Sequence, residues 1–149
     1  MMTKNGHFRG SAEETLFLEL LRTTEMLSRS LAEVLKQADL SPTQYNVLRI
    51  LRGAGEGLSC GEIGKRMITH DPDITRLLDR LEKRRLVARS RDNEDRRMVL
   101  TRITAEGMKL LGALDEPVQT AHRSLLGHLS REKQRQLTEL LEVARARIS

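Results

Sequence analysis

A cluster of arginine and lysine side chains between Arg76 and Arg102 offers most of the binding chemistry in this sequence. The 149-residue chain has 26 Lys/Arg and 21 Asp/Glu, of which ten basic and only five acidic residues lie in this segment. Sixteen of each sign remain elsewhere, so the formal net charge of +5 belongs to this segment alone. Guanidinium and ammonium groups bind phosphate through charge and hydrogen bonds. The segment is therefore expected to bind a polyanion such as nucleic acid.

A helix is predicted from Asp71 onwards. Asp71 can cap the free N–H groups of the first turn, and Pro72 suits the first helical position. Apolar side chains then recur with helical spacing on one face: Ile74, Leu77, Leu78 and Leu81. The opposite face is polar and comprises Asp73, Thr75, Arg76, Asp79, Arg80 and Lys83. The charge of this face alone is equally typical of an ordinary amphipathic surface helix. The flanking sequence must therefore distinguish such a helix from one that binds nucleic acid.

The flanking sequences favour a helix-turn-helix with a wing. Residues 86–91 and 98–103 have the composition of strands, and the turn at 92–97 contains no apolar residue. Upstream, Ser59 and Glu62 have the spacing of a capping box that begins a short helix. A short helix, a tight turn and a longer helix form a DNA-binding motif, and the arginines of the hairpin can enter a minor groove.

Long helical segments are predicted at both ends of the chain, at 11–38 and 105–149, around a winged lobe at 41–104. Pro117 is expected to kink or break the second segment. The apolar stripes of these segments are longer than the lobe can cover, which favours burial against a second copy. The interface residues predicted from these stripes are Leu20, Leu27, Leu137, Leu141 and Ile148. A hairpin of the first and last helices within one chain is the alternative.

Composition narrows the possible functions. Aromatic residues make up 2% of the chain, which argues against single-strand binding by base stacking. The single cysteine, Cys60, allows no disulfide within one chain, and His122 and His128 are six residues apart, unlike a helical metal pair. No catalytic set, metal site or cofactor motif is found. Without a signal peptide or a membrane-spanning stretch in the sequence, we expect a cytoplasmic location.

Three stretches resemble the MarR family of bacterial transcriptional regulators: LSPTQYNVLRIL, DITRLLDRLEKRRLVAR and DNEDRRMVLTRITAEG. The resemblance extends from about Glu13 to Ile148. It implies a single, mainly α domain, with a small β-hairpin wing and terminal dimerisation helices. It also implies a homodimer that binds a pseudo-palindromic double-stranded DNA operator, usually as a repressor released by a small molecule or an oxidant.

The resemblance also assigns roles to individual residues. Asp95 matches the aspartate that braces the wing arginine, and Arg97 matches that arginine. The residues expected to contact DNA are Asp73, Thr75, Arg76, Arg80, Arg96 and Arg97. Many relatives carry Ser or Thr where this chain has Asp71 and Asp73. A carboxylate there repels phosphate, so Asp73 is expected either to accept from a cytosine amino group or to orient Arg76.

Two other functions fit parts of the sequence. Cys60 lies in the first turn of a predicted helix, where the helix dipole can activate a thiol for redox sensing. A small half-buried structural residue is the simpler interpretation of this cysteine. A winged-helix adaptor that binds protein is the second alternative, although such a wing does not need this much positive charge.

Overall fold

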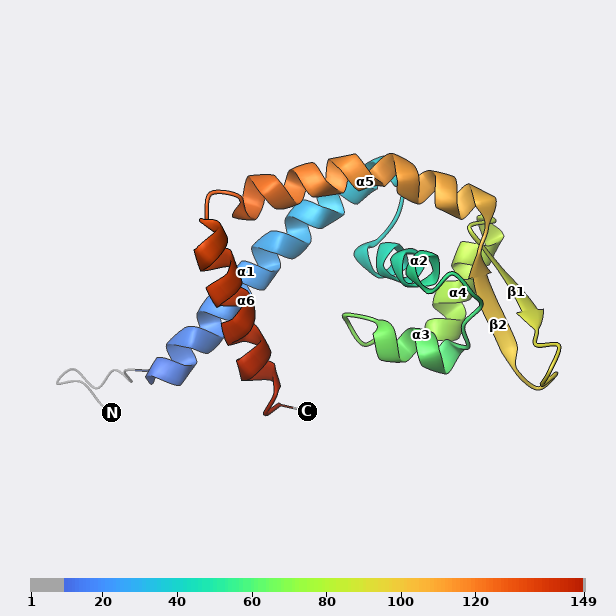
Figure 1. The fold of residues 1–149 in the computed structure, drawn as a ribbon, viewed down its shortest axis with the longest axis horizontal. Helices are drawn as coiled ribbons and strands as arrows, with labels where there is room; N and C mark the ends of the chain where they lie inside the picture. Colours follow the sequence, from blue (N-terminus) through green and yellow to red (C-terminus); the bar gives the residue numbers. More distant parts are fainter. Residues whose placement is uncertain (1–9, 149) are drawn as a thin grey trace.

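The computed structural model describes residues 10–148, so the N-terminal residues that bear on a signal peptide lie largely outside it. Figure 1 shows a lobe of short helices and a hairpin held at one end of two long helices. In chain order the elements are α1 (Ala12–Leu35), η1 (Lys36–Ala38), α2 (Pro42–Ala54), α3 (Cys60–Arg66), α4 (Ile74–Lys83), β1 (Val87–Arg91), β2 (Val99–Ile103), α5 (Ala105–Leu126) and α6 (Arg131–Arg145). The predicted winged helix-turn-helix fold is confirmed.

Polar side chains begin each α-helix by accepting a hydrogen bond from a backbone N–H of its first turn. The N-caps are Ser11, Ser41, Ser59, Asp73, Thr104 and Ser130. Ser41 and Gln44 form a complete capping box at α2. The prediction that Asp71 caps α4 is wrong: the cap is Asp73, whose Oδ1 accepts from the N–H of Arg76 at 3.0 Å. Asp71 instead accepts from the N–H of Asp73, a local turn that delays the helix.

An aliphatic core joins the lobe to the long helices. Its fully buried members come from α1, α2, α3, α4, β1 and α5 and include Leu35, Leu48, Ile63, Leu78, Leu81, Val87, Leu111 and Leu114. Burying each such side chain contributes roughly 1.5–3 kcal/mol. The apolar face of α4 therefore points inwards, and its polar face is left outside.

The wing is an antiparallel hairpin in which Val87 pairs with Ile103 and Arg91 with Val99. Leu58 adds a single bridge to the outer edge of β2 through two backbone hydrogen bonds with Thr101. The start of α5 packs closely against this hairpin at Gly107. A Cβ atom at Gly107 would lie 2.4 Å from the carbonyl oxygen of Leu86, so only glycine fits there.

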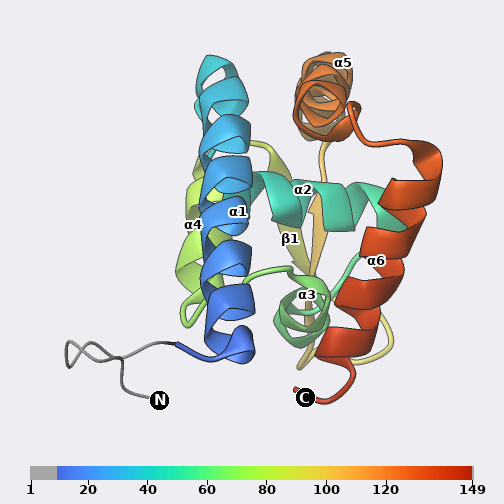
Figure 2. The ribbon, with the colours of Figure 1, turned by 90° about the vertical axis from the view of Figure 1, so that its left-hand side faces the viewer.

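The terminal helices leave much apolar surface uncovered in a single copy. α1 packs alongside α5, and α6 lies apart from α1 on the other side of the molecule, which does not match a hairpin of the first and last helices (Figure 2). α6 has no buried residue, and α1 buries only Leu35. Of the kink or break predicted at Pro117, the break does not occur, because α5 continues through this residue. Within the described residues, no helix is long and apolar enough to cross a membrane.

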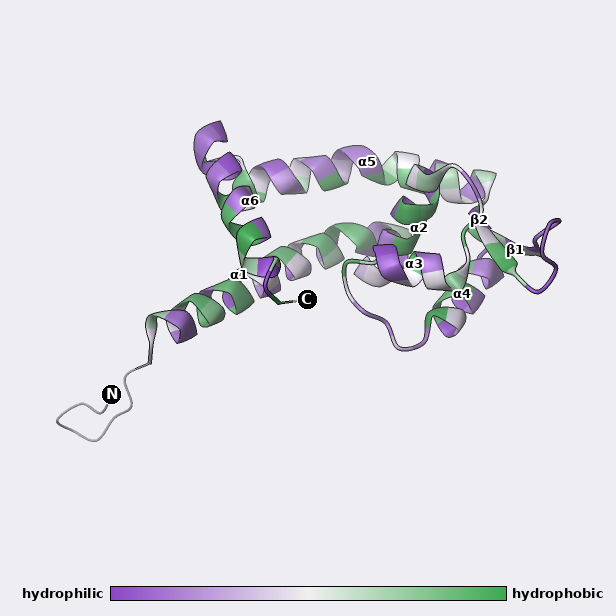
Figure 3. Cartoon of the chain, turned by 60° about the horizontal axis from the view of Figure 1, so that its bottom comes forward, coloured by the Kyte–Doolittle hydropathy of each residue, from purple (hydrophilic) through white to green (hydrophobic). Residues whose placement is uncertain are grey.

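The residues predicted for a dimer interface lie on this uncovered surface. Leu20 and Leu137 are exposed, Leu27 and Leu141 are half-buried, and Ile148 is 78% exposed. Hydrophobic residues, green in Figure 3, extend along α1 and recur on α6. The interface itself stays a prediction, and the exposed stripes are the surface that it requires.

Candidate nucleic-acid interface

The outer face of α4 presents three cations in neighbouring positions. Arg76, Arg80 and Lys83 are exposed and recur at i, i+4 and i+7. Across the described part of the chain, none of the three lies within 4.0 Å of a carboxylate in an ion pair. Thr75 is exposed beside them. These side chains are therefore free to bind an external anion.

Asp73 has a local role in this structure. One of its carboxylate oxygens is occupied by the N–H of Arg76, so the residue fixes where the polar face of α4 begins. It thereby positions the backbone of Arg76, and its role in orienting the Arg76 side chain stays a prediction. Contact between Asp73 and a base stays a prediction.

The wing holds a second set of cations at its tip. Asp95 Oδ1 accepts from both the backbone N–H and the Nε of Arg97, at 3.1 and 3.2 Å, so the predicted bracing contact is present. Arg97 is nevertheless 92% exposed, so its guanidinium projects from the hairpin. Arg91 donates to the carbonyl oxygen of Arg96 at 2.8 Å and closes the turn. Figure 3 shows the wing tip as strongly hydrophilic.

An ion-pair cluster that was not predicted from the sequence joins the wing to α4. Arg89 of β1 donates through Nη2 to Asp79 and to Glu82 of α4, and its backbone N–H also donates to Glu82 at 3.1 Å. The guanidinium of Arg89 lowers the pKa of Glu82 below its ordinary value, and both carboxylates raise the pKa of Arg89. This cluster fixes the wing relative to α4. Alternation along β1 places Arg89 on a defined face, but no local signal shows which residues it meets.

Two further arginines connect the lobe to the long helices. Arg52 of α2 makes a bidentate contact with Asp115 of α5, with both N···O distances at 2.9 Å. The side-chain hydrogen bond from Arg52 lowers the pKa of Asp115. Arg84, just after α4, donates to the carbonyl oxygens of Ala38 and Asp39 at the end of η1. The basic segment thus contains structural arginines as well as cations that are free for a ligand.

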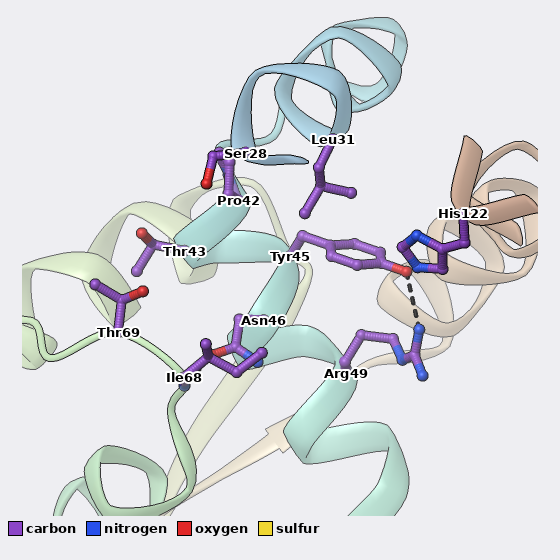
Figure 4. Close-up of a pocket in the computed structure, with 10 residues that line it drawn as sticks. All are labelled: Ser28, Leu31, Pro42, Thr43, Tyr45, Asn46, Arg49, Ile68, Thr69 and His122. Carbon is purple, nitrogen blue, oxygen red and sulfur yellow. Dashed lines mark hydrogen bonds between the residues drawn. The ribbon is translucent and has the colours of Figure 1, made fainter. Parts of the chain in front are cut away.

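A pocket of about 360 Å³ lies where α1, α2, α5 and the turn between α3 and α4 meet. Figure 4 shows Tyr45, Arg49 and His122 on one side and Asn46, Ile68 and Thr69 on another. Arg49 donates to the hydroxyl oxygen of Tyr45 at 3.0 Å. The volume of this pocket is typical of a site that binds a small molecule. A more open groove of about 430 Å³ lies between α1, α5 and α6.

The described residues contain no group of three or more His, Cys, Asp or Glu side chains placed to hold a metal ion. Cys60 is half-buried at the start of α3 and packs against the hydrophobic core. That environment matches the structural interpretation of this cysteine.

Comparison with known proteins gives consistent results. The sequence model of the MarR family matches residues 40–99. The HTH-type transcriptional regulator FarR of Neisseria gonorrhoeae is 30% identical over 131 residues, which cover 88% of this chain and 89% of FarR. A MarR transcription factor from Planctomyces limnophilus is similar in structure, with a TM-score of 0.68, 40% identity and coverage of 92% and 99% of the two chains. A mutant of MarR from E. coli, solved in complex with operator DNA, gives a TM-score of 0.80 at 27% identity, covering 87% and 93%.

Proposed function

Because this chain belongs to the MarR family and is a DNA-binding transcriptional regulator rather than an enzyme, we propose that it is a homodimeric repressor released by a small organic anion. The observation that carries the DNA-binding part is the pairing of two free cationic surfaces. One is the face of α4 with Arg76, Arg80 and Lys83, and the other is the wing tip with Arg97. As a DNA-binding regulator, the protein acts in the cytoplasm in this proposal.

The shapes of these two surfaces suit the two grooves of duplex DNA. An exposed helix fits the major groove, where arginine can make a bidentate contact with guanine. A protruding guanidinium such as that of Arg97 fits a narrow minor groove, where the negative potential is greatest. Asp95 holds that guanidinium, and the Arg89 cluster holds the whole wing. Arg96 and Thr75 then contact the adjacent phosphates.

A second copy covers the apolar stripes of α1 and α6. Leu20, Leu27, Leu137, Leu141 and Ile148 form the interface in this proposal. A two-fold dimer places two α4 helices about 34 Å apart, one turn of DNA, so the operator is pseudo-palindromic.

The effector binds in the pocket between α1, α2 and α5. Arg49 provides a cation whose described hydrogen-bond partner is the neutral hydroxyl of Tyr45, and His122 lines the same pocket. Leu31, Tyr45 and Ile68 provide apolar walls. A positive group on an apolar wall suits a small ring that carries a carboxylate or phenolate.

The test is fluorescence anisotropy with a labelled duplex from the region upstream of the protein's own gene, beside a scrambled duplex. We expect tight binding to the first, weaker binding to the second, and a steep fall of both with salt. Benzoate, nicotinate and their hydroxylated forms are then titrated against the complex. Failure to bind either duplex would refute the DNA-binding proposal, and binding that no aromatic acid weakens would refute the proposed effector class.

A further inference from the structure

We infer that Asn46 is the positioning residue that couples the pocket to the DNA-binding helix α4. Its side chain holds the turn that leads into α4, and a molecule in the pocket contacts both partners of this bond. The inference rests on the proposed function and specifies how occupancy of that pocket changes DNA binding.

The bond joins two elements that are distant in the sequence. Asn46 Oδ1, on α2, accepts from the backbone N–H of Ile68 at 2.9 Å. Ile68 directly follows the C-cap of α3 and is 87% exposed, so apolar packing does little to hold it. Asp73 also bonds to the first turn of α4, but among the described residues the Asn46 bond is the hydrogen bond that connects the segment 68–73 to an element other than α4. The position of the turn therefore depends on Asn46.

The two ends of α4 are held in different ways. At its C-terminal end, Arg84 makes two charge-assisted hydrogen bonds to the end of η1, and Arg89 adds ion pairs nearby. At its N-terminal end, the segment 68–73 has the neutral bond to Asn46. Charge-assisted bonds are about twice as strong as neutral ones. The N-terminal end, which carries Thr75 and Arg76, thus has the weaker polar connection to the rest of the lobe.

The pocket includes both sides of this weaker connection. Asn46, Ile68 and Thr69 line it together, and Figure 4 shows Asn46 directly beside Ile68. A ligand shifts an equilibrium only if it binds the two states with different affinity. The turn itself forms one wall of the pocket, so displacing the turn changes the shape of the pocket. A ligand therefore binds the protein with different affinity before and after the turn is displaced. Occupancy and operator binding are then linked reciprocally.

The first experiment measures hydrogen exchange at the Ile68 amide and binding to operator and random duplexes. In Asn46→Ala we expect protection of Ile68 to be lost and operator affinity to fall about 2- to 10-fold, the range for one neutral hydrogen bond. Random-duplex affinity, which depends on phosphate contacts, falls less, so the operator-to-random ratio narrows. Asn46→Asp keeps the acceptor oxygen, so it should restore the exchange protection of the Ile68 amide and the operator-to-random affinity ratio. Thr43 also lines this pocket. Thr43→Ala should leave Ile68 protection and the operator-to-random affinity ratio unchanged.

The second experiment fills the pocket without a known effector. Thr43→Cys in a Cys60→Ser background is treated with benzyl methanethiosulfonate; the thiolate displaces methanesulfinate and forms a mixed disulfide that carries the benzyl group. We expect the label to lower operator affinity about 2- to 10-fold when Asn46 is present. Adding Asn46→Ala should remove most of this effect, because the connection is already broken.

The outcomes separate the two proposals. Unchanged Ile68 protection in Asn46→Ala, or operator and random affinities that fall in parallel, would overturn the role of Asn46. A label that acts equally with and without Asn46, or that has no effect in either protein, would overturn the coupling. A wild-type protein that binds no duplex would instead refute the proposed function, and exchange at Ile68 would still decide whether the Asn46 bond holds the turn.

Discussion

Replacing Arg89 with methionine tests whether the wing and α4 form one rigid unit. Arg89→Met keeps the aliphatic stem and removes the guanidinium, which leaves the carboxylates of Asp79 and Glu82 without their cation. Hydrogen bonds to charged groups contribute roughly 1.5–3 kcal/mol each. The two carboxylate side chains are 54% and 41% exposed, so water replaces part of this contribution. We therefore expect a net loss of about 1–2 kcal/mol in the free energy of unfolding.

The pH dependence of this loss has a definite sign. Arg89 lowers the pKa of Glu82 in the folded state. A depressed carboxyl pKa stabilises the fold above the unfolded value of roughly 4.3, and this contribution disappears as the pH falls through the folded pKa. The difference in the free energy of unfolding between the wild type and Arg89→Met should therefore be largest at pH 7 and should shrink towards pH 3.

Urea unfolding at a fixed protein concentration, at several pH values, measures both effects. Arg102→Met is the matched control, because Arg102 is an exposed residue of the same hairpin with no carboxylate ion pair in the described structure. It should change stability by less than about 0.5 kcal/mol. Equal losses in the two variants, or a loss in Arg89→Met that persists unchanged at low pH, would refute the reasoning.

Five other substitutions test separate parts of the proposal. Arg97→Ala should weaken binding to all duplexes and reduce by about one the steepness with which log affinity falls against log salt concentration. Asp95→Ala should reproduce part of this effect. If Arg97→Ala binds duplexes like the wild type, the wing assignment is wrong. Arg76→Ala should reduce the difference in binding free energy between operator and random DNA by about 1–3 kcal/mol. A parallel fall of both affinities would indicate that Arg76 contacts phosphate alone. Leu141→Asp should dissociate the dimer and weaken operator binding together, as light scattering and anisotropy can show; a stable wild-type monomer at micromolar concentration would contradict the interface. Cys60→Ser should leave DNA binding unchanged in peroxide and in reductant, and loss of a peroxide response in this variant would favour redox sensing.

The helices and the wing could be predicted because their signals are local. The spacing of Leu77, Leu78 and Leu81 defines the buried face of α4 whatever it packs against, and all three are buried. The strands begin and end within one residue of the predicted ranges, because the polar turn at 92–97 separates them clearly. The contact of Asp95 with Arg97 spans only two residues, so a family resemblance was enough to assign it.

Features that depend on tertiary contacts could not be predicted. Arg89, Arg84 and Asn46 meet partners 7 to 46 residues away, and nothing in their immediate neighbours specifies those partners. The start of α4 was misplaced because two aspartates flank Pro72, and both satisfy the local rules for a cap. Arg85 adopts a left-handed conformation with a φ of 61°, which its residue type does not favour.

Hydroxyl-radical footprinting of the wild-type protein on DNA upstream of its own gene is the most direct test of the DNA-binding surface. If α4 and the wing bind as proposed, a dimer should protect two half-sites whose centres are about one helical turn apart. Protection should extend into the minor grooves that flank them, and Arg97→Ala should remove this flanking protection selectively. No protected site, or a footprint that keeps its flanks in Arg97→Ala, would contradict the proposed interface.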